Sequence, residues 1–180
     1  MIYNKHNLAV AKVAGKSQMR PEIAGVFFTK NKTVATDSFR LVEIDTPTMP
    51  NVPEMEGAMK GIKPFIVDVV GIKLKDDELL RIKHVDESHV QFVKEDGGVM
   101  SGRRVNGEFP GYESIFPTGK PTAKVKVNAR YLAEVLDILG KLGGNNSEVE
   151  LKVYEDRRQI VIEAGTLNQK GRGIIMGLSE

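Results

Sequence analysis

A regular spacing of apolar residues near the end of the chain predicts a helix flanked by strands. Five residues recur at the i, i+3, i+4 and i+7 positions of one helix face, namely Leu132, Val135, Leu136, Leu139 and Leu142. Asn128 precedes them and suits the cap position, because its side-chain oxygen can accept a bond from a first-turn N–H. Apolar and alternating segments predict strands at 124–127, 149–153, 159–164 and 173–178. The expected order is β-α-β-β-β.

The beginning of the chain shows the same order. An apolar pair at 2–3 precedes a helix expected at 5–15, and strands are expected at 25–29, 32–36 and 40–45. Because repeats at a fixed period define an architecture, a further copy is expected in the middle of the chain.

The middle of the chain also fits this order. A strand starting at Phe65 precedes a short helix expected at 69–74, and strands are expected at 79–85, 88–94 and 99–104. Each of the three stretches thus begins with a strand and a helix and continues with three strands. Such an arrangement is α+β, with the helices on one face and antiparallel sheets on the other.

Three residues that suit a helix cap mark the repeat. Asn4, Asp68 and Asn128 each follow an apolar residue, and they lie roughly sixty residues apart. We therefore expect two modules at about 1–60 and 61–117, which together make residues 1–117 a complete domain. Residues 118–180 form a third module, which is half of a second domain. Units this small have open sheet edges and need neighbours to close them.

The composition is that of a globular chain from a reducing compartment. The chain has 180 residues, of which 41% are hydrophobic and none is cysteine. Disulfides and cysteine-bound metals are excluded, and a cytoplasmic location is expected. No apolar run approaches the ~20 residues that span a bilayer, and residues 1–12 lack the layout of a secretion signal. We therefore expect no membrane partner.

No group of residues predicts catalysis, a cofactor or a metal site. His6, His84 and His89 are too scattered in the sequence to indicate a metal site. Gly15-Lys16-Ser17 resembles the end of a phosphate-binding loop, but the required earlier glycine is Val10. A non-enzymatic protein is expected.

Basic residues near the first two predicted helices are candidates for contact with DNA, and we single out Lys12, Lys16, Arg20 and Lys73. If the helices line one surface, these side chains would contact phosphates without regard to sequence. The alternative is that they serve solubility, because the net charge is only +2 and lysines commonly occupy wet helix faces.

A segment rich in proline and aromatic residues lies at 107–117. Pro110 and Pro117 bracket Tyr112 and Phe116, so the segment is neither helix nor central strand. It is either a linker whose aromatic side chains pin two modules together or one wall of a groove for a peptide, and the two interpretations are compatible.

The stretch Val34-Ala35-Thr36-Asp37-Ser38-Phe39-Arg40-Leu41 joins two predicted strands through a turn at Asp37-Ser38. It resembles a signature of the bacterial sliding clamp family, the beta subunit of DNA polymerase III. Four further segments resemble this family and follow the order of a clamp. They are Arg20 to Val26, the Phe-Pro-x-Tyr motif at Phe109 to Tyr112 together with Ile115 and Pro117, and Tyr131 to Leu136 followed by Gly173 to Leu178.

The resemblance implies the DNA-clamp fold, in which β-α-β-β-β modules form a ring with helices lining the hole. It implies a processivity factor that encircles double-stranded DNA and holds it weakly. Its expected partners are DNA polymerase, other replication proteins with clamp-binding motifs, a clamp loader and copies of itself. It also implies an apolar groove for short peptides, formed by Ile23, Thr36, Arg40, Leu41, Pro110, Ile115, Ile174, Ile175, Met176 and Leu178.

The chain departs from the family pattern at several positions. Gly177 and Ser179 stand where the family usually has proline and arginine, Phe39 replaces a small polar residue or histidine, and Ser114 replaces a common arginine. The family has six modules per chain, whereas this chain has three, so a ring of the family's size would need about four chains, as a tetramer. The alternative is a clamp-like adaptor or decoy of phage or mobile-element type, which binds clamp-binding peptides without encircling DNA.

Overall fold

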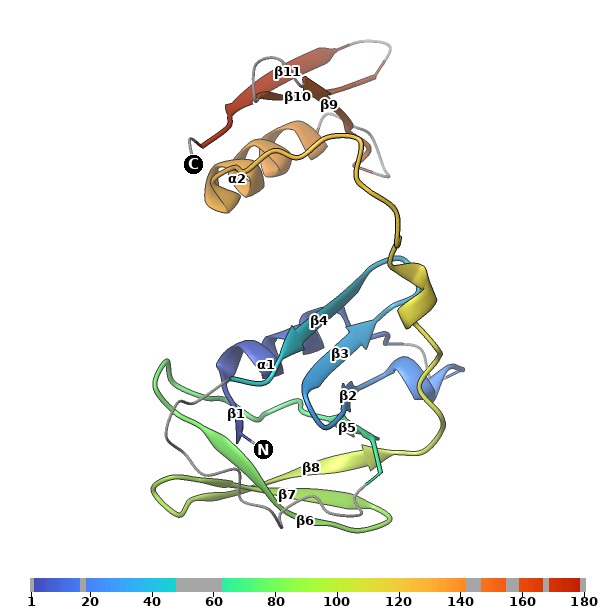
Figure 1. Cartoon of the computed structure of the whole chain (residues 1–180), viewed down its shortest axis with the longest axis vertical. Helices are drawn as coiled ribbons and strands as arrows, with labels where there is room; N and C mark the ends of the chain where they lie inside the picture. The colour runs from blue at the N-terminus through green and yellow to red at the C-terminus, as the bar shows by residue number, and fades with distance from the viewer. Residues whose placement is uncertain are drawn as a thin grey trace. The chain divides into compact units, whose positions relative to one another are not determined.

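Two compact units, Met1–Ile115 and Phe116–Glu180, make up the chain. The computed structural model describes residues 2–16, 19–47, 63–141, 147–154, 159–166 and 169–178. Each unit has its own sheet and its own helix (Figure 1). The class is α+β, as the sequence predicted.

The first unit is built on one antiparallel sheet of eight strands. Its elements are β1 (Ile2–Tyr3), α1 (Lys5–Ala9), β2 (Val26–Phe28), β3 (Lys32–Thr36), β4 (Leu41–Asp45), β5 (Phe65–Asp68), β6 (Leu80–Val85), β7 (His89–Lys94) and β8 (Val99–Val105). Short 3-10 turns occur at Val10–Val13, Pro21–Ile23 and Glu113–Ile115. The order in the sheet is β1-β6-β7-β8-β5-β2-β3-β4.

The two modules of the first unit exchange their first strands. β1 opens the first module but pairs with β6 of the second, with Ile2 opposite Arg81. β5 opens the second module and lies between β8 of its own module and β2 of the first, with Val67 opposite Val26. Each module therefore needs the other to complete its sheet, as expected for small repeats with open edges.

The sheet of the first unit carries apolar clusters on both faces. One face packs Phe28 and Phe92 with Leu8 of α1 and Val10 of the following 3-10 turn. Successive strand residues point to opposite faces. The other face therefore carries a smaller cluster of Val34, Ile66, Phe109 and Tyr112, which we call the aromatic cluster.

A fully buried asparagine joins α1 to the edge of the sheet. The Asn7 side chain donates from Nδ2 to Thr33 Oγ1 at 3.2 Å and to the carbonyls of Ile44 and Asp45, both at 3.1 Å. Its Oδ1 accepts from the N–H of Asn4 at 3.1 Å. These bonds satisfy a polar group that would otherwise be costly to bury.

The second unit is a three-stranded sheet with one helix. Its elements are α2 (Ala129–Gly140), β9 (Glu150–Tyr154), β10 (Gln159–Gly165) and β11 (Lys170–Met176), and the sheet order is β11-β10-β9. The helix covers one face of the sheet, where Leu139, Ile160, Ile162 and Ile175 form the core. Asn128 caps α2 by accepting from the N–H groups of Arg130 and Tyr131, as predicted.

The predicted helix at 69–74 is wrong. Asp68 Oδ1 accepts from the N–H of Val70 at 2.9 Å, and the N–H of Ile72 reaches the carbonyl of Val69 at 3.0 Å, which closes a single turn. Gly71 then adopts φ of +90°, a left-handed conformation that ends the turn. The predicted helix at 5–15 is also shorter, because α1 ends at Ala9 and continues as a 3-10 turn.

The predicted strand at 124–127 is also wrong. No strand of the described chain pairs with this segment, although the N–H of Leu178 donates to the carbonyl of Lys126 at 2.7 Å. Strand geometry needs a neighbouring backbone, and this segment has only that one bond. Leu142 and Ser179 lie outside the described residues. None of the helices that the structure describes is long and apolar enough for a membrane span.

Candidate peptide-binding groove

The hairpin between β3 and β4 is held by a network around Asp37. Thr36 lies opposite Leu41, and four residues connect them. Asp37 Oδ1 accepts from the N–H groups of Phe39 and Arg40, both at 3.0 Å, and its Oδ2 accepts from Arg40 Nε at 2.9 Å. The backbone N–H of Arg40, more than any other partner, holds the pKa of Asp37 below its ordinary value. The loop therefore has a fixed shape that depends on an ionised carboxylate.

The threonine of this hairpin is used inside the loop. Thr36 Oγ1 donates to the carbonyl of Arg40 at 2.9 Å and accepts from the N–H of Ser38 at 3.1 Å. Ser38 has φ of +79°, so the loop includes one left-handed residue. Phe39 is 98% exposed at the tip. The Thr36 hydroxyl thus shapes the loop, and Phe39 is the side chain that the loop presents to solvent.

Ile23 and Thr36 are brought together through one glycine. The N–H of Gly15 donates to the carbonyl of Ile23 at 2.8 Å and to the carbonyl of Thr36 at 3.0 Å. The Ile23 side chain is only 3% exposed. Ile23 would therefore support a groove from beneath, and the exposed Arg40 lies on the outside of the same hairpin.

Leu41 packs against the aromatic cluster. The rings of Phe27 and Phe109 are stacked with centroids 4.6 Å apart, and the Phe109 ring meets Tyr112 edge-on at 6.0 Å. Burial raises the pKa of Tyr112. Phe109 and Tyr112 thus anchor the segment that contains Pro110 in the same cluster against which Leu41 packs.

Ile115 lies at the end of the first unit and is 69% exposed, in the 3-10 turn Glu113–Ile115. Its neighbour Phe116 is 44% exposed. Two large apolar side chains are therefore accessible just after the aromatic cluster, where a peptide could cover them.

The four remaining groove candidates come from the second unit. Ile175 is 4% exposed and packs under α2, whereas Ile174 and Met176 are 54% and 60% exposed on the opposite face of β11. Leu178 follows the strand and is 45% exposed. Strand alternation explains the division, because neighbouring residues point to opposite faces. Ile174, Met176 and Leu178 can contact a peptide, and Ile175 would support them from the core.

The four cations predicted to face DNA are all exposed. Lys12 lies on the 3-10 turn after α1, and Lys16 follows it. Lys73 lies after the turn at Gly71 and not on a helix. The Arg20 guanidinium binds within its own unit, to Glu22 Oε1 at 3.2 Å and Ser38 Oγ at 2.7 Å. Arg20 thus braces the hairpin loop, and its contact with DNA stays a prediction.

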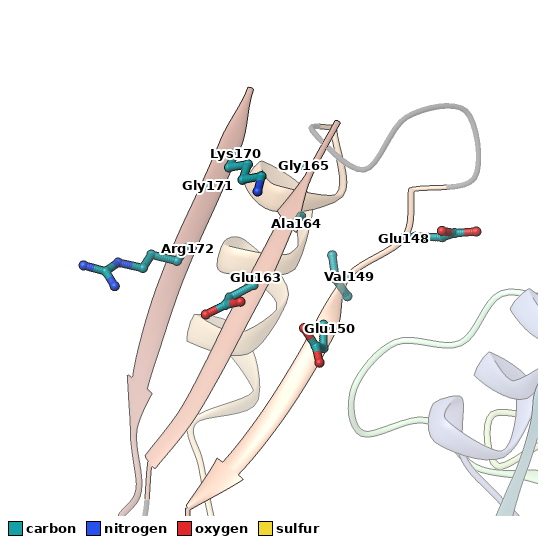
Figure 2. Close-up of a pocket in the computed structure, with 9 residues that line it drawn as sticks. All are labelled: Glu148, Val149, Glu150, Glu163, Ala164, Gly165, Lys170, Gly171 and Arg172. Atoms are coloured by element: carbon teal, nitrogen blue, oxygen red, sulfur yellow. The ribbon is translucent and has the colours of Figure 1, made fainter. Parts of the chain in front are cut away.

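The second unit has a hollow of about 720 Å³. It is lined by Glu148, Val149, Glu150, Glu163, Ala164, Gly165, Lys170, Gly171 and Arg172. Figure 2 shows that the charged side chains fan outward and do not converge on one point. Within the described ranges, no group of three or more histidine and acidic residues is arranged to hold a metal.

Comparison with known proteins gives a match through structure. No family model and no curated protein matches the sequence. The DNA polymerase sliding clamp of Bacillus subtilis, however, has a TM-score of 0.70 at 20% identity, over 98% of this chain and 48% of that chain. The fold is that of a bacterial DNA sliding clamp.

Further clamp structures agree. The beta subunit of the DNA polymerase of Streptococcus pyogenes gives a TM-score of 0.69 at 17% identity, over 99% of this chain and 50% of that one. The beta sliding clamp of Bartonella birtlesii, solved with griselimycin bound, gives a TM-score of 0.68 at 17% identity, over 100% of this chain and 51% of that one. At such identities the similarity concerns the clamp fold, and the chain spans about half the length of these clamps.

Two contacts near the candidate groove were not predicted from the sequence. Phe27 was assigned only to a strand, although its ring stacks on Phe109. Arg20 was assigned to DNA, although it binds Ser38 in the hairpin loop. The position of Phe27, on the face opposite the helix side, was the available signal. Phe27 finds its partner there because the Phe-Pro-x-Tyr segment covers that face.

Proposed function

We propose that this chain is a minimal DNA sliding clamp, a non-catalytic processivity factor that encircles duplex DNA as a homo-oligomeric ring. The observation that carries the proposal is the clamp fold, which extends over nearly the whole chain with TM-scores of 0.68 to 0.70. Because the chain spans about half of each clamp, a closed ring requires more copies than the clamps themselves need. A tetramer is the state that the count of modules favours.

The same proposal includes a groove for short apolar motifs of polymerase and other replication proteins. The residues proposed to contact such a motif are Leu41 and Pro110 in the first unit. In the second unit they are the exposed Ile174 and Met176 of β11 and Leu178 after it. Burying such side chains contributes ~25 cal/mol per Å² of apolar surface. Arg40, which is exposed beside Leu41, can interact with the peptide backbone or its acidic groups.

Retention on circular DNA tests the ring. The chain is loaded onto nicked plasmid with a clamp loader and separated from free protein by gel filtration, before and after linearisation. A topological ring stays on the circle and is lost when the DNA is cut, because it holds DNA by enclosure and only weakly by charge. Binding that is insensitive to linearisation, or no retention, contradicts the ring.

Charge-reversal variants separate enclosure from charge. Lys12→Glu, Lys16→Glu and Lys73→Glu together should lower retention on nicked circles, because three candidate phosphate contacts are reversed. The matched control reverses Lys30, Lys83 and Lys120, which are also exposed. If the native chain binds clamp-binding peptides but is not retained on nicked circles, the adaptor interpretation replaces the ring.

A further inference from the structure

The sheet of the second unit has an open edge at β9. This strand is hydrogen-bonded to β10 on one side, and no strand among the described residues pairs with its other side. Leu151 and Val153 of β9 are 50% and 46% exposed. An exposed edge strand with apolar side chains is a template on which a further strand can form.

The first unit shows what occupies the corresponding edge. β2 and β6 are the first full strands after the opening segment of their modules, as β9 is in the third module. The edge of β2 pairs with β5 and the edge of β6 pairs with β1. In both cases the added strand is the segment that opens the other module, next to the turn-capping residue Asn4 or Asp68.

The third module has such an opening segment of its own. Residues 124–127 directly precede Asn128, which caps α2. Val125 and Val127 pack against the core under the helix, and the carbonyl of Lys126 accepts from Leu178, just after the last strand of the module. β5 similarly lies beside β8, the last strand of its module, and uses its other side to reach β2. Residues 124–127 therefore lie beside the last strand of their module, as β5 does. Unlike β5, they have no strand on their other side among the described residues.

We propose that two copies of this chain exchange these segments, so that residues 124–127 of each copy add as an antiparallel strand to β9 of the other. The occupant is a second copy because one chain carries both complementary parts, the open edge and the segment that fits it. The exchange is reciprocal, so one two-fold contact completes both edges. It would supply a subunit contact of the ring, and in that respect it rests on the proposed function.

The charges along the two segments are complementary. Within 124–127 the two valines face the core, which leaves Lys124 and Lys126 on the other side. On β9, Glu150 lies opposite Glu163 of β10, and the Lys152 ammonium lies 3.4 Å from the carboxylate of Glu150 and 2.7 Å from that of Glu163. An exchange that sets the segment against the start of β9 can bring Lys126 opposite Glu150, which adds a second lysine to this pair of carboxylates. Opposite charges across strands stabilise a pairing, whereas like charges destabilise it.

The exchange would also pair two third modules with each other. Two third modules joined in this way would repeat the design of the first unit, in which two modules complete one sheet through their first strands. Two such pairs of chains would then contain the modules of the proposed tetrameric ring. The composite domain differs from the first unit in that both halves have the same sequence.

Charge reversal across the exchange is the decisive experiment. Lys126→Glu should lower the mass of the assembly in light scattering by half and weaken self-association at least about tenfold, because each contact then sets glutamates against glutamates. Glu150→Lys should do the same, because it sets a lysine against Lys126. An equimolar mixture of the two variants should restore the full mass, since every exchanged pair is again of opposite charge. Lys120→Glu, an exposed lysine outside the segment, should leave the mass unchanged.

Cysteine cross-linking tests the same contact without reversing any charge, since each chain loses only one charged side chain. The chain has no cysteine, so each introduced thiol is unique. A tagged Lys126→Cys chain mixed with a differently tagged Glu150→Cys chain should form a mixed disulfide dimer on mild oxidation. Replacing the first chain with Lys120→Cys is the control. A mixed dimer that is no more abundant than in this control overturns the exchange.

The results separate this inference from the proposed function. A full-mass assembly in the Lys126→Glu variant, or a mixture that does not restore the mass, overturns the exchange even if the chain is retained on nicked circles. Restored mass and specific cross-links support the exchange even if nothing is retained on DNA, in which case the ring is wrong.

Discussion

Replacing Asn7 should cost the first unit several kilocalories per mole, because this buried side chain makes four hydrogen bonds. Three are donated to Thr33, Ile44 and Asp45, and one is accepted from Asn4. A hydrogen bond contributes about 1 kcal/mol net, and a buried group left without a partner costs about 1 to 3 kcal/mol. Asn7→Ala removes all four bonds and strips a partner from Thr33. We expect a loss of about 3 kcal/mol.

Asn7→Asp is the sharper variant because it keeps the shape of the side chain. The Oδ1 atom can still accept from Asn4, but an oxygen replaces Nδ2 at 3.1 Å from two carbonyl oxygens. Burial and these carbonyls would raise the pKa of the introduced carboxyl. The penalty is therefore fully present above the raised pKa and shrinks as the pH falls toward the unfolded value of about 3.9.

Urea unfolding followed by amide NMR signals measures these losses, because signals from residues 2–115 report on the first unit separately. The control is Asn106→Ala, since Asn106 is exposed. A loss below about 1 kcal/mol for Asn7→Ala, or one no greater than that of Asn106→Ala, would refute the assignment of Asn7 as the bond between α1 and the sheet edge. So would an Asn7→Asp chain as stable as the native one at neutral pH.

Three further predictions concern the groove and the sheet. Leu41→Ala with Met176→Ala should weaken an apolar polymerase-tail peptide at least about tenfold, or ~1.4 kcal/mol, in a fluorescence titration. Gly102→Ala should cost about 1 to 3 kcal/mol in urea unfolding, because the added Cβ would lie 2.5 Å from Val67 Cγ1, whereas Gly111→Ala meets nothing within 4 Å. Since the pKa of Asp37 is lowered, its contribution is present above the unfolded pKa and is lost as the pH falls through the folded pKa. A carboxyl carbon NMR titration should give a midpoint below 3.8.

Each of these predictions has a contrary result. The groove control is Val42→Ala with Ile138→Ala, which truncates exposed apolar residues on other surfaces, and an equal effect of both pairs would remove Leu41 and Met176 from the groove. A Gly102→Ala chain as stable as Gly111→Ala would show that β8 and β5 can separate without cost. A titration midpoint of Asp37 at or above 3.8 would mean that the hairpin network does not persist in solution.

The strands and the two capped helix starts could be predicted because their signals are local. Alternation placed β3 (Lys32–Thr36) correctly, and Asn4 and Asn128 cap the helices that they were expected to cap. The predicted helix at 69–74 failed for a local reason too, since the left-handed Gly71 ends the turn. Periodicity over six residues carries too little information to exclude a turn.

The pairing of strands could not be predicted in the same way. Nothing in the pattern around Ile2 indicates that it pairs with Arg81, because register is set by contacts between distant segments. The same limit applies to the groove. Leu41 and Pro110 were predicted from the sequence, whereas the contact of Phe27 is seen only in the fold. The Phe27 ring connects the hairpin to the Phe-Pro-x-Tyr segment.

The position of β1 at one end of the eight-stranded sheet has a consequence for synthesis. Ile2 and Tyr3 leave the ribosome before Arg81 and Leu80, which they face and which follow roughly eighty residues later. At about 5 to 20 residues per second, the N-terminal strand waits several seconds for its place. A nascent chain halted before β6 therefore leaves β1 without its partner strand and exposes Tyr3, which the finished fold buries completely.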